Sequence, residues 1–208
     1  MLNRGFTLIE VLVTLVILTF GLLGIAGLMA KGQRASFEAF QRQQAISLAS
    51  DMSERVRANR KEAVTYIAAA PINSPLGGGT LYGDLLQGSV TDCGTSNCTT
   101  AQLATYDAAQ WDGLLNGYSE ALVAGGTRVG GIVNARGCIA QTADTSASCP
   151  AAPSPSVPFT RTVRISVAWQ GNEDTAAPTT STCGQGLYGA ETKRRIAVLD
   201  LMVLQPCP

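Results

Sequence analysis

The sequence predicts an α+β protein in which a long N-terminal helix packs against a C-terminal antiparallel sheet. Three observations support this prediction. An uncharged run over residues 11–30 leads into apolar residues at helical spacing, apolar and polar residues alternate over residues 162–169, and all six cysteines follow residue 90. A helical period followed by a strand period indicates an α+β arrangement, and an even number of cysteines late in the chain indicates disulfides.

The composition of the 208-residue chain disfavours several functional classes. Charged residues make up 14 %, against roughly 25 % in average soluble domains, so part of the chain is expected to avoid water. The formal net charge is zero, which gives no long-range attraction to phosphate backbones and disfavours a nucleic-acid binder. The chain has no histidine, so triad hydrolases and histidine-ligated metalloenzymes are poor candidates.

The first expected element is an apolar helix long enough to cross a membrane. No charge lies between Glu10 and Lys31, and a helix rising about 1.5 Å per residue over this run spans the roughly 30 Å of a bilayer's hydrocarbon core. A cleavable secretory signal peptide is the alternative, with Arg4 at its start and a small-x-small site at residues 24–26. The run exceeds the usual apolar core of such peptides, roughly 7–15 residues, so we expect a retained helix.

Glu10 lies among apolar residues at the entrance of this helix. A carboxylate in such a place is unfavourable unless it is protonated or paired with a cation. Arg4 is the one basic side chain close to it in sequence. We therefore expect the partner to be the chain terminus or another protein, with protonation as the alternative.

Residues 4–10, Arg-Gly-Phe-Thr-Leu-Ile-Glu, resemble the class III signal of type IV prepilins. The resemblance implies a type IV pilin-like fold, cleavage by the prepilin peptidase between Gly5 and Phe6, and N-methylation of Phe6. It also implies an intersubunit salt bridge between Glu10 and the terminal amine of a neighbouring subunit. Such a bridge would supply the cation that Glu10 needs.

The helix is expected to continue beyond the membrane to about residue 65. No proline precedes Pro71, and apolar residues recur at helical spacing at Ala45, Leu48, Ala49, Met52 and Val56. Charges at spacings of four and three support an exposed face, in the pairs Asp51 with Arg55 and Glu54 with Arg57. The basic cluster at the helix end is expected on a solvated face and comprises Arg55, Arg57, Arg60 and Lys61.

The expected organisation is a leader at residues 1–5, a membrane-spanning or filament-core helix at 6–30, an amphipathic helix at 31–70 and a periplasmic α+β head at 71–208. Basic residues flank the apolar run on both sides, so charge alone does not orient it. Disulfides need an oxidising compartment, which places the head in the periplasm. Gly21, Gly24 and Gly27 indicate either a close-packing helix face or a section that loosens when the subunit leaves the membrane.

The head is expected to begin with a loop at residues 71–79 and to contain a second, short helix. Thr99 and Gln102 fit a capping box at its start, and Asn116 with Gly117 would end it. Trp111 on the apolar face of this helix is expected in the core rather than at a ligand.

The last eighty residues or so show a strand period. Val163, Ile165, Val167 and Trp169 predict a half-buried strand, and residues 196–204 predict another, with a bulge at Val198 and Leu199 where the apolar phase changes. Residues 129–134 and 138–141 are weaker strand candidates separated by a hairpin turn at 135–137. Residues 149–158 are expected to form a loop.

The six cysteines are expected to pair sequentially, although many pairings are open to them. The expected bridges are Cys93 with Cys98, Cys138 with Cys149, and Cys183 with Cys207. A zinc site is disfavoured because histidine and any Cys-x-x-Cys pair are missing. Residues 171–174 offer oxygens to calcium without a cation-loop spacing, so a solvated turn is expected there, and we expect no metal and no cofactor.

The chain also resembles, more narrowly, minor pilins of the pilus modification type. The residues that carry this resemblance are 51–60, Cys93, Cys98 and the helix that contains Trp111. It implies a structural subunit, not an enzyme, that primes pilus assembly in support of twitching motility and adhesion. The implied partners are other minor pilins, the major pilin, a tip adhesin, the prepilin peptidase and the inner-membrane assembly platform, with no nucleic acid. The implied location is the inner membrane, as a single-pass protein, before assembly, and the pilus, at its tip, afterwards.

Two other functions stay open from the sequence. A minor pseudopilin of type II secretion shares the leader and the helix, although a six-cysteine head with a second helix fits it less well. A membrane-anchored enzyme or binding module of the envelope would need a reactive constellation, and the sequence contains no nucleophile motif.

Overall fold

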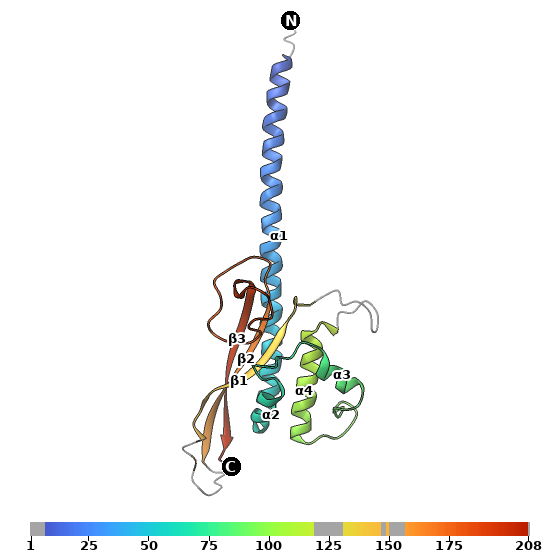
Figure 1. The fold of residues 1–208 in the computed structure, drawn as a ribbon, viewed down its shortest axis with the longest axis vertical. Coiled ribbons are helices and arrows are strands. Elements are labelled where there is room, and N and C mark those ends of the chain that lie inside the picture. Colours follow the sequence, from blue (N-terminus) through green and yellow to red (C-terminus); the bar gives the residue numbers. More distant parts are fainter. Residues whose placement is uncertain (1–6, 119–130, 147–148, 150–156, 208) are drawn as a thin grey trace. The chain divides into compact units, whose positions relative to one another are not determined.

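A computed structural model of the chain describes residues 7–118, 131–146, 149 and 157–207. The chain forms two compact units, divided between Phe40 and Gln41. Helix α1 (Leu8–Ala58) contributes to both, and Figure 1 labels it with the other α-helices and the strands. The predicted α+β class is confirmed, with a long apolar N-terminal helix, an antiparallel sheet, further short helices and three disulfides. The second unit comprises Gln41–Pro208 and is called the head below. The expected division into residues 1–5, 6–30, 31–70 and 71–208 stays a prediction.

The first unit is the N-terminal part of α1. Every side chain from residue 7 to residue 37 is exposed, including large apolar ones such as Phe20 and Leu28. The most apolar window of α1 has a mean hydropathy of 2.6, and α1 is the one helix among the described residues with the length and composition to cross a membrane. The helix continues through Gly21, Gly24 and Gly27, and a Cβ added at any of the three would meet nothing within 4 Å. Close packing or loosening at these glycines stays a prediction.

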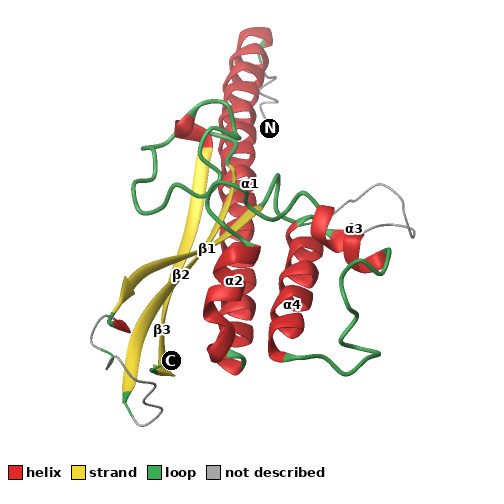
Figure 2. Ribbon diagram, turned by 60° about the horizontal axis from the view of Figure 1, so that its bottom comes forward, coloured by secondary structure: helices red, strands yellow, loops and turns green. Residues whose placement is uncertain are grey.

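The head consists of a three-stranded antiparallel sheet and helices. The strands are β1 (Arg136–Asp144), β2 (Pro158–Gln170) and β3 (Arg194–Pro206), in the order β1-β2-β3. The helices beyond α1 are η1 (Arg60–Glu62), α2 (Ala63–Ala69), α3 (Thr80–Leu86), α4 (Thr100–Leu115) and η4 (Glu191–Lys193). Within this unit, α2 lies between the sheet and α4 (Figure 2).

The core lies where the last turns of α1 meet the sheet and α4. The predicted stripe of α1 is buried, with Ala45, Met52 and Val56 at 0 % exposure, and it packs with the inward face of β2. Trp111 of α4 is fully buried, as predicted, and its Nε1–H donates to the carbonyl oxygen of Leu48 at 3.0 Å. One indole therefore links α4 to α1.

Helix α1 ends at Ala58, so the expectation of a single helix to about residue 65 was wrong. Asn59 leaves the helical conformation (φ −114°, ψ 42°), and its side-chain amide donates to the carbonyl oxygen of Thr100 at 2.7 Å. The chain then continues through η1 into α2. The break coincides with this tertiary hydrogen bond, and no proline or glycine lies near it in the sequence.

Helix α4 agrees with its prediction. The Thr99 side chain accepts from the Gln102 N–H at 3.2 Å, and the Gln102 side chain accepts from the Thr99 N–H at 2.9 Å, which completes the capping box. Asn116 caps the other end, and Gly117 follows with φ 70°. The short helix α3 was not predicted.

The hairpin turn expected at residues 135–137 does not form. Arg136 and Gly137 belong to β1, and the described residues 131–134 lie outside any strand. Gly137 is required by packing rather than by a turn, because a Cβ there would lie 2.5 Å from Leu115 Cδ1 and from Trp111 Cζ3. The loop expected at residues 149–158 lies mostly outside the described residues.

The strand expected over residues 196–204 is β3, but it has no bulge at Val198 and Leu199. The pairing of β2 with β3 is continuous, and the register shift is in β1, between Gln141 and Ala143. The apolar phase of β3 changes because Ile196 packs into a second cluster with Cys138, Ala168, Cys183 and Tyr188. The outer sheet face is thus covered at this end, which the alternation could not indicate.

Two of the three expected disulfide pairings were wrong. The structure contains Cys93–Cys98, as expected, but joins Cys138 to Cys183 and Cys149 to Cys207. Cys138 lies on the outer face of β1, where the β2–β3 connection brings Cys183 against it. Cys207 follows β3, and its N–H donates to the carbonyl oxygen of Val157 beside β2, at the end of the sheet where Cys149 also lies. In both disulfides the two cysteines are brought together by the arrangement of the strands, and not by their closeness in the sequence.

Candidate functional site

The N-terminal turn of α1 carries the acid singled out in the sequence. Glu10 is exposed, and its backbone N–H donates to the Thr7 carbonyl oxygen at 3.1 Å. Among the ion pairs between described residues, none involves Glu10. Gly5 and Phe6, the predicted cleavage and methylation site, lie outside the described residues.

The surface around Glu10 is apolar over a long stretch. Leu8 is 82 % exposed and Ile9 is 71 % exposed, and the exposed apolar residues continue to Met29. Contiguous apolar surface on this scale marks contact with lipid or with protein. In either environment the carboxylate of Glu10 needs a cation or a proton.

Arg55 organises the polar part of the head. Its Nε–H donates to Asp51 at 3.0 Å, and Nη1 donates to Asp107 of α4 at 2.9 Å and to Gln110 of α4 at 2.8 Å. Burial alone would lower the pKa of Arg55, but Asp51 and Asp107 raise it above its usual value. The expectation that the basic residues at the helix end lie on a solvated face was therefore wrong for Arg55, which joins α1 to α4. It was correct for Arg57, whose exposed side chain pairs with Glu54.

Asp107 also receives a hydrogen bond from Tyr66 of α2. The Tyr66 hydroxyl donates to Asp107 Oδ2 at 2.5 Å. Burial raises the pKa of Tyr66, and the neighbouring carboxylate raises it further, so the hydroxyl keeps its proton. The carboxylate of Asp107 thus connects α1, α2 and α4.

A second buried carboxylate, Asp112, fixes the loop before α3. It is 1 % exposed and accepts hydrogen bonds from the backbone N–H groups of Gly77 at 2.5 Å, Gly79 at 3.1 Å and Tyr82 at 3.1 Å. Neither this acid nor Asp107 was identified from the sequence, because charged residues on a helix usually face water. The one signal in the sequence is the glycine-rich loop at residues 71–79, because the backbone N–H groups of a fixed loop need a hydrogen-bond acceptor nearby.

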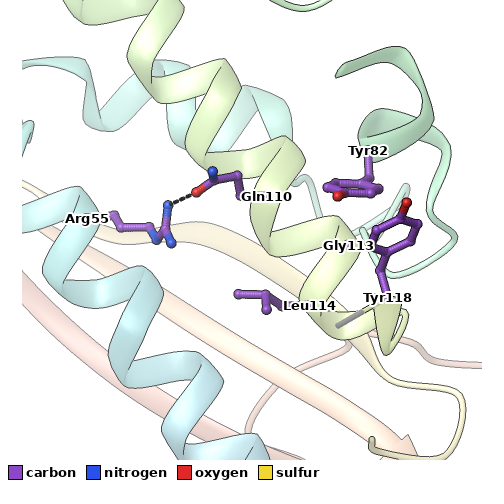
Figure 3. Close-up of a pocket in the computed structure, with 6 residues that line it drawn as sticks. All are labelled: Arg55, Tyr82, Gln110, Gly113, Leu114 and Tyr118. Carbon is purple, nitrogen blue, oxygen red and sulfur yellow. Dashed lines mark hydrogen bonds between the residues drawn. The ribbon is translucent and has the colours of Figure 1, made fainter. Parts of the chain in front are cut away.

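The pocket in Figure 3 lies beside this network and has a volume of about 270 Å³. Its lining residues are Arg55, Tyr82, Gln110, Gly113, Leu114 and Tyr118. The rings of Tyr82 and Tyr118 are 4.4 Å apart between centroids and tilted by 53°. Arg55 is already paired with two carboxylates, so the pocket offers apolar and neutral polar contacts. No nucleophile and base are paired among its described residues, so we assign it no chemistry.

The structure brings together no metal-binding cluster in the part of the chain that it describes, where no three His, Cys, Asp or Glu side chains converge. The turn at residues 171–174 is tied to the start of β3. Arg195 donates to the Glu173 carbonyl oxygen at 2.6 Å, and the Thr192 hydroxyl donates to Asp174 at 2.6 Å. These bonds account for the fold of the turn.

A long helix that is apolar in its first part, carries an acid in its first turn and builds its last turns into an α+β head defines the class of membrane-anchored pilin-like subunits. Comparison with protein families agrees: residues 1–26 match the prokaryotic N-terminal methylation motif, and residues 28–109 match the family described as type IV pilin Tt1218. By these two matches the chain is similar to type IV pilins, and each match covers less than half of the chain. Neither the curated proteins nor the solved structures gave a match.

The sheet lies outside both matched ranges, since β1 begins at Arg136. The family is one of structural subunits, and its members associate with other pilins and with the pilus assembly machinery. The methylation motif and the apolar helix fit a pilin that is anchored in the membrane before assembly.

Proposed function

We propose that this chain is a minor pilin of the type IV pilus, a PilV-like structural subunit that primes filament assembly. The observation that carries the proposal is the position of Glu10, an acid in the first turn of an exposed apolar helix, within residues that match the methylation motif. In this role the leader, residues 1–5, is removed after Gly5, and Phe6 becomes the N-methylated terminus. Glu10 then pairs with the terminal amine of a neighbouring subunit.

The partners in this role are other minor pilins, the major pilin, a tip adhesin, the prepilin peptidase and the inner-membrane platform. The head lies in the periplasm before assembly, and the subunit lies in the pilus, at its tip, afterwards. Twitching motility and adhesion are the cellular functions that follow. Three disulfides in the head favour an oxidising compartment for it.

Mass spectrometry of the mature terminus, together with recovery of the chain in sheared pili, tests the proposal. A methylated Phe6 and presence in sheared pili would support it. A mature chain that begins near Lys31, without the apolar helix, would overturn it.

The second candidate is a minor pseudopilin of a type II secretion system, which the methylation motif and the helix fit equally well. Deleting the gene and measuring both pilus assembly and protein secretion separates the two. Loss of secretion with normal pili would favour the pseudopilin.

A further inference from the structure

A second pocket, with a volume of about 400 Å³, lies at the end of the head where η1 and α2 meet the sheet. Lys61 and Val64 line it from the helix side, and the sheet contributes Phe159, Arg161, Gln205 and Pro206. Gln205 is fixed, because its side-chain amide donates to the carbonyl oxygens of Arg60 at 2.6 Å and Lys61 at 3.1 Å. The pocket therefore has a rigid wall on the sheet side and two exposed side chains, Lys61 and Val64, on the other.

Arg161 is the unusual member of this lining. It is 8 % exposed, and its Nη2 donates to Asp144 Oδ2 at 3.0 Å, across the β1–β2 pairing. Its guanidinium carbon lies 5.5 Å from the centroid of the Phe159 ring. The Nε and Nη1 atoms have no hydrogen-bond acceptor and each exposes less than 1 Å² to solvent. Most of the five N–H donors of this guanidinium thus lack both a protein acceptor and contact with bulk water.

Among the described residues, the acids near Arg161 do not supply the missing acceptor. Asp144 is shared between Arg161 and the N–H of Ser146, and Glu62, next to Lys61, accepts hydrogen bonds from the hydroxyls of Thr65 and Thr100. Residues 145–157, which join β1 to β2, include no Asp or Glu. Buried donors in folded proteins are almost always satisfied, so an acceptor from elsewhere fits this site.

The charge and the walls of the pocket select the kind of acceptor. Arg161 and Lys61 are cations and Asp144 is an anion, which leaves one net positive charge to be balanced. A monoanion matches that charge better than a dianionic phosphate, and an arginine guanidinium pairs well with a carboxylate. Val64, Phe159 and Pro206 offer apolar contacts to whatever carries the charge.

We propose that this pocket binds a monocarboxylate carried on an apolar body. The carboxylate accepts from the free nitrogens of Arg161, with Lys61 at the entrance, and the apolar body lies against Val64 and Phe159. Entry requires side chains of the pocket wall to shift, because the two arginine nitrogens are covered in the free chain. The carboxylate comes either from a neighbouring subunit, in which case the inference rests on the proposed function, or from a free metabolite.

The first test is a titration of the full chain in non-ionic detergent with N-acetylleucine. Binding is monitored by the NMR signal of the Arg161 Nε–H. N-acetylleucinamide, which lacks the charge, and inorganic phosphate are the comparison ligands. The signal is expected to shift and saturate with the carboxylate at about 1–10 mM, and to respond at least about tenfold more weakly to the amide and to phosphate. An equal response to the amide, or no response to the carboxylate, would overturn the proposal.

Variants localise the binding. Arg161→Gln should abolish saturable binding of N-acetylleucine; because this variant lacks the Arg161 signal, binding is monitored by the backbone amide signal of Val64. Lys61→Gln should weaken binding about two- to fivefold. Arg164→Gln is the matched control, because Arg164 is on the same strand but on the opposite face, paired with Asp200 at 2.7 Å. If Arg161→Gln does not fold, Arg161→Lys keeps the charge and removes the planar fork. Equal losses in the Arg164 and Arg161 variants would overturn the site.

Recovery of Arg161→Gln in sheared pili distinguishes the two sources. Reduced recovery with normal leader cleavage indicates a carboxylate from a neighbouring subunit, and normal recovery with lost binding of N-acetylleucine indicates a free monocarboxylate. The titration needs no assembled filament. Absence of the wild-type chain from pili would therefore count against the proposed function and leave the binding result standing.

Discussion

Replacing Gly137 by alanine is expected to destabilise the head, because β1 passes directly over α4 at this residue. The added Cβ would lie 2.5 Å from Trp111 Cζ3 and from Leu115 Cδ1, and both side chains are buried. The indole cannot move away freely, since its Nε1–H donates to Leu48 at 3.0 Å. Overpacking of this kind typically costs about 1–3 kcal/mol, while replacing glycine in a strand returns about 0.5–1 kcal/mol. The net expected loss is about 1–2 kcal/mol.

Thermal unfolding of the full chain in detergent, followed by tryptophan fluorescence, measures this loss. A change of about 1–2 kcal/mol corresponds to a fall in Tm of about 2–8 °C for a unit of this size. Gly83→Ala is the matched control, because Gly83 lies inside α3 and the nearest atom to an added Cβ is 3.9 Å away. That substitution should stabilise the head by about 0.5–1 kcal/mol, through helix propensity. A Tm that rises for Gly137→Ala as well would refute the close packing of β1 on Trp111.

Three further predictions concern Glu10 and the disulfides. Glu10→Ala should leave leader cleavage intact but lower recovery in sheared pili, because in the proposed function this acid pairs with the terminal amine of a neighbouring subunit; undiminished recovery would contradict this. In the chain-entropy account, removing the Cys138–Cys183 bridge, with a separation of 45 residues, should cost about 4 kcal/mol, against about 2 kcal/mol for Cys93–Cys98, with a separation of 5. Urea unfolding of the paired Cys→Ala variants gives the order, and a larger loss at Cys93–Cys98 would reverse it. The unreduced, denatured chain should contain no free thiol, and six titratable thiols would argue against all three bridges.

The parts of the fold that follow from local sequence were predictable. The buried stripe of α1 follows from a period of 3.6 residues, the start of α4 from Thr99 and Gln102, and the alternation in β2 from a period of two. Each of these signals depends on neighbours within a few residues. Glu10 was also identifiable, because an acid beside a long apolar run has no local explanation.

The parts that depend on distant residues were not predictable. The end of α1 coincides with a hydrogen bond between Asn59 and Thr100, and Gly137 suggested a turn although it accommodates Trp111. Arg161 had the spacing of an ordinary strand residue, and the pocket beside it exists only because η1 and α2 pack against the end of the sheet. Periodicity gives the element and the face, but it does not identify what packs against that face.

The crossed arrangement of the two long-range disulfides has a consequence for biogenesis. Along the chain Cys149 falls between Cys138 and Cys183, yet its partner is Cys207, which is synthesised after the other five cysteines. An oxidant that joins cysteines as they emerge would trap Cys138 with Cys149, and only thiol exchange could release that pair. Maturation of this chain therefore requires a disulfide isomerase, or strand pairing that is faster than oxidation.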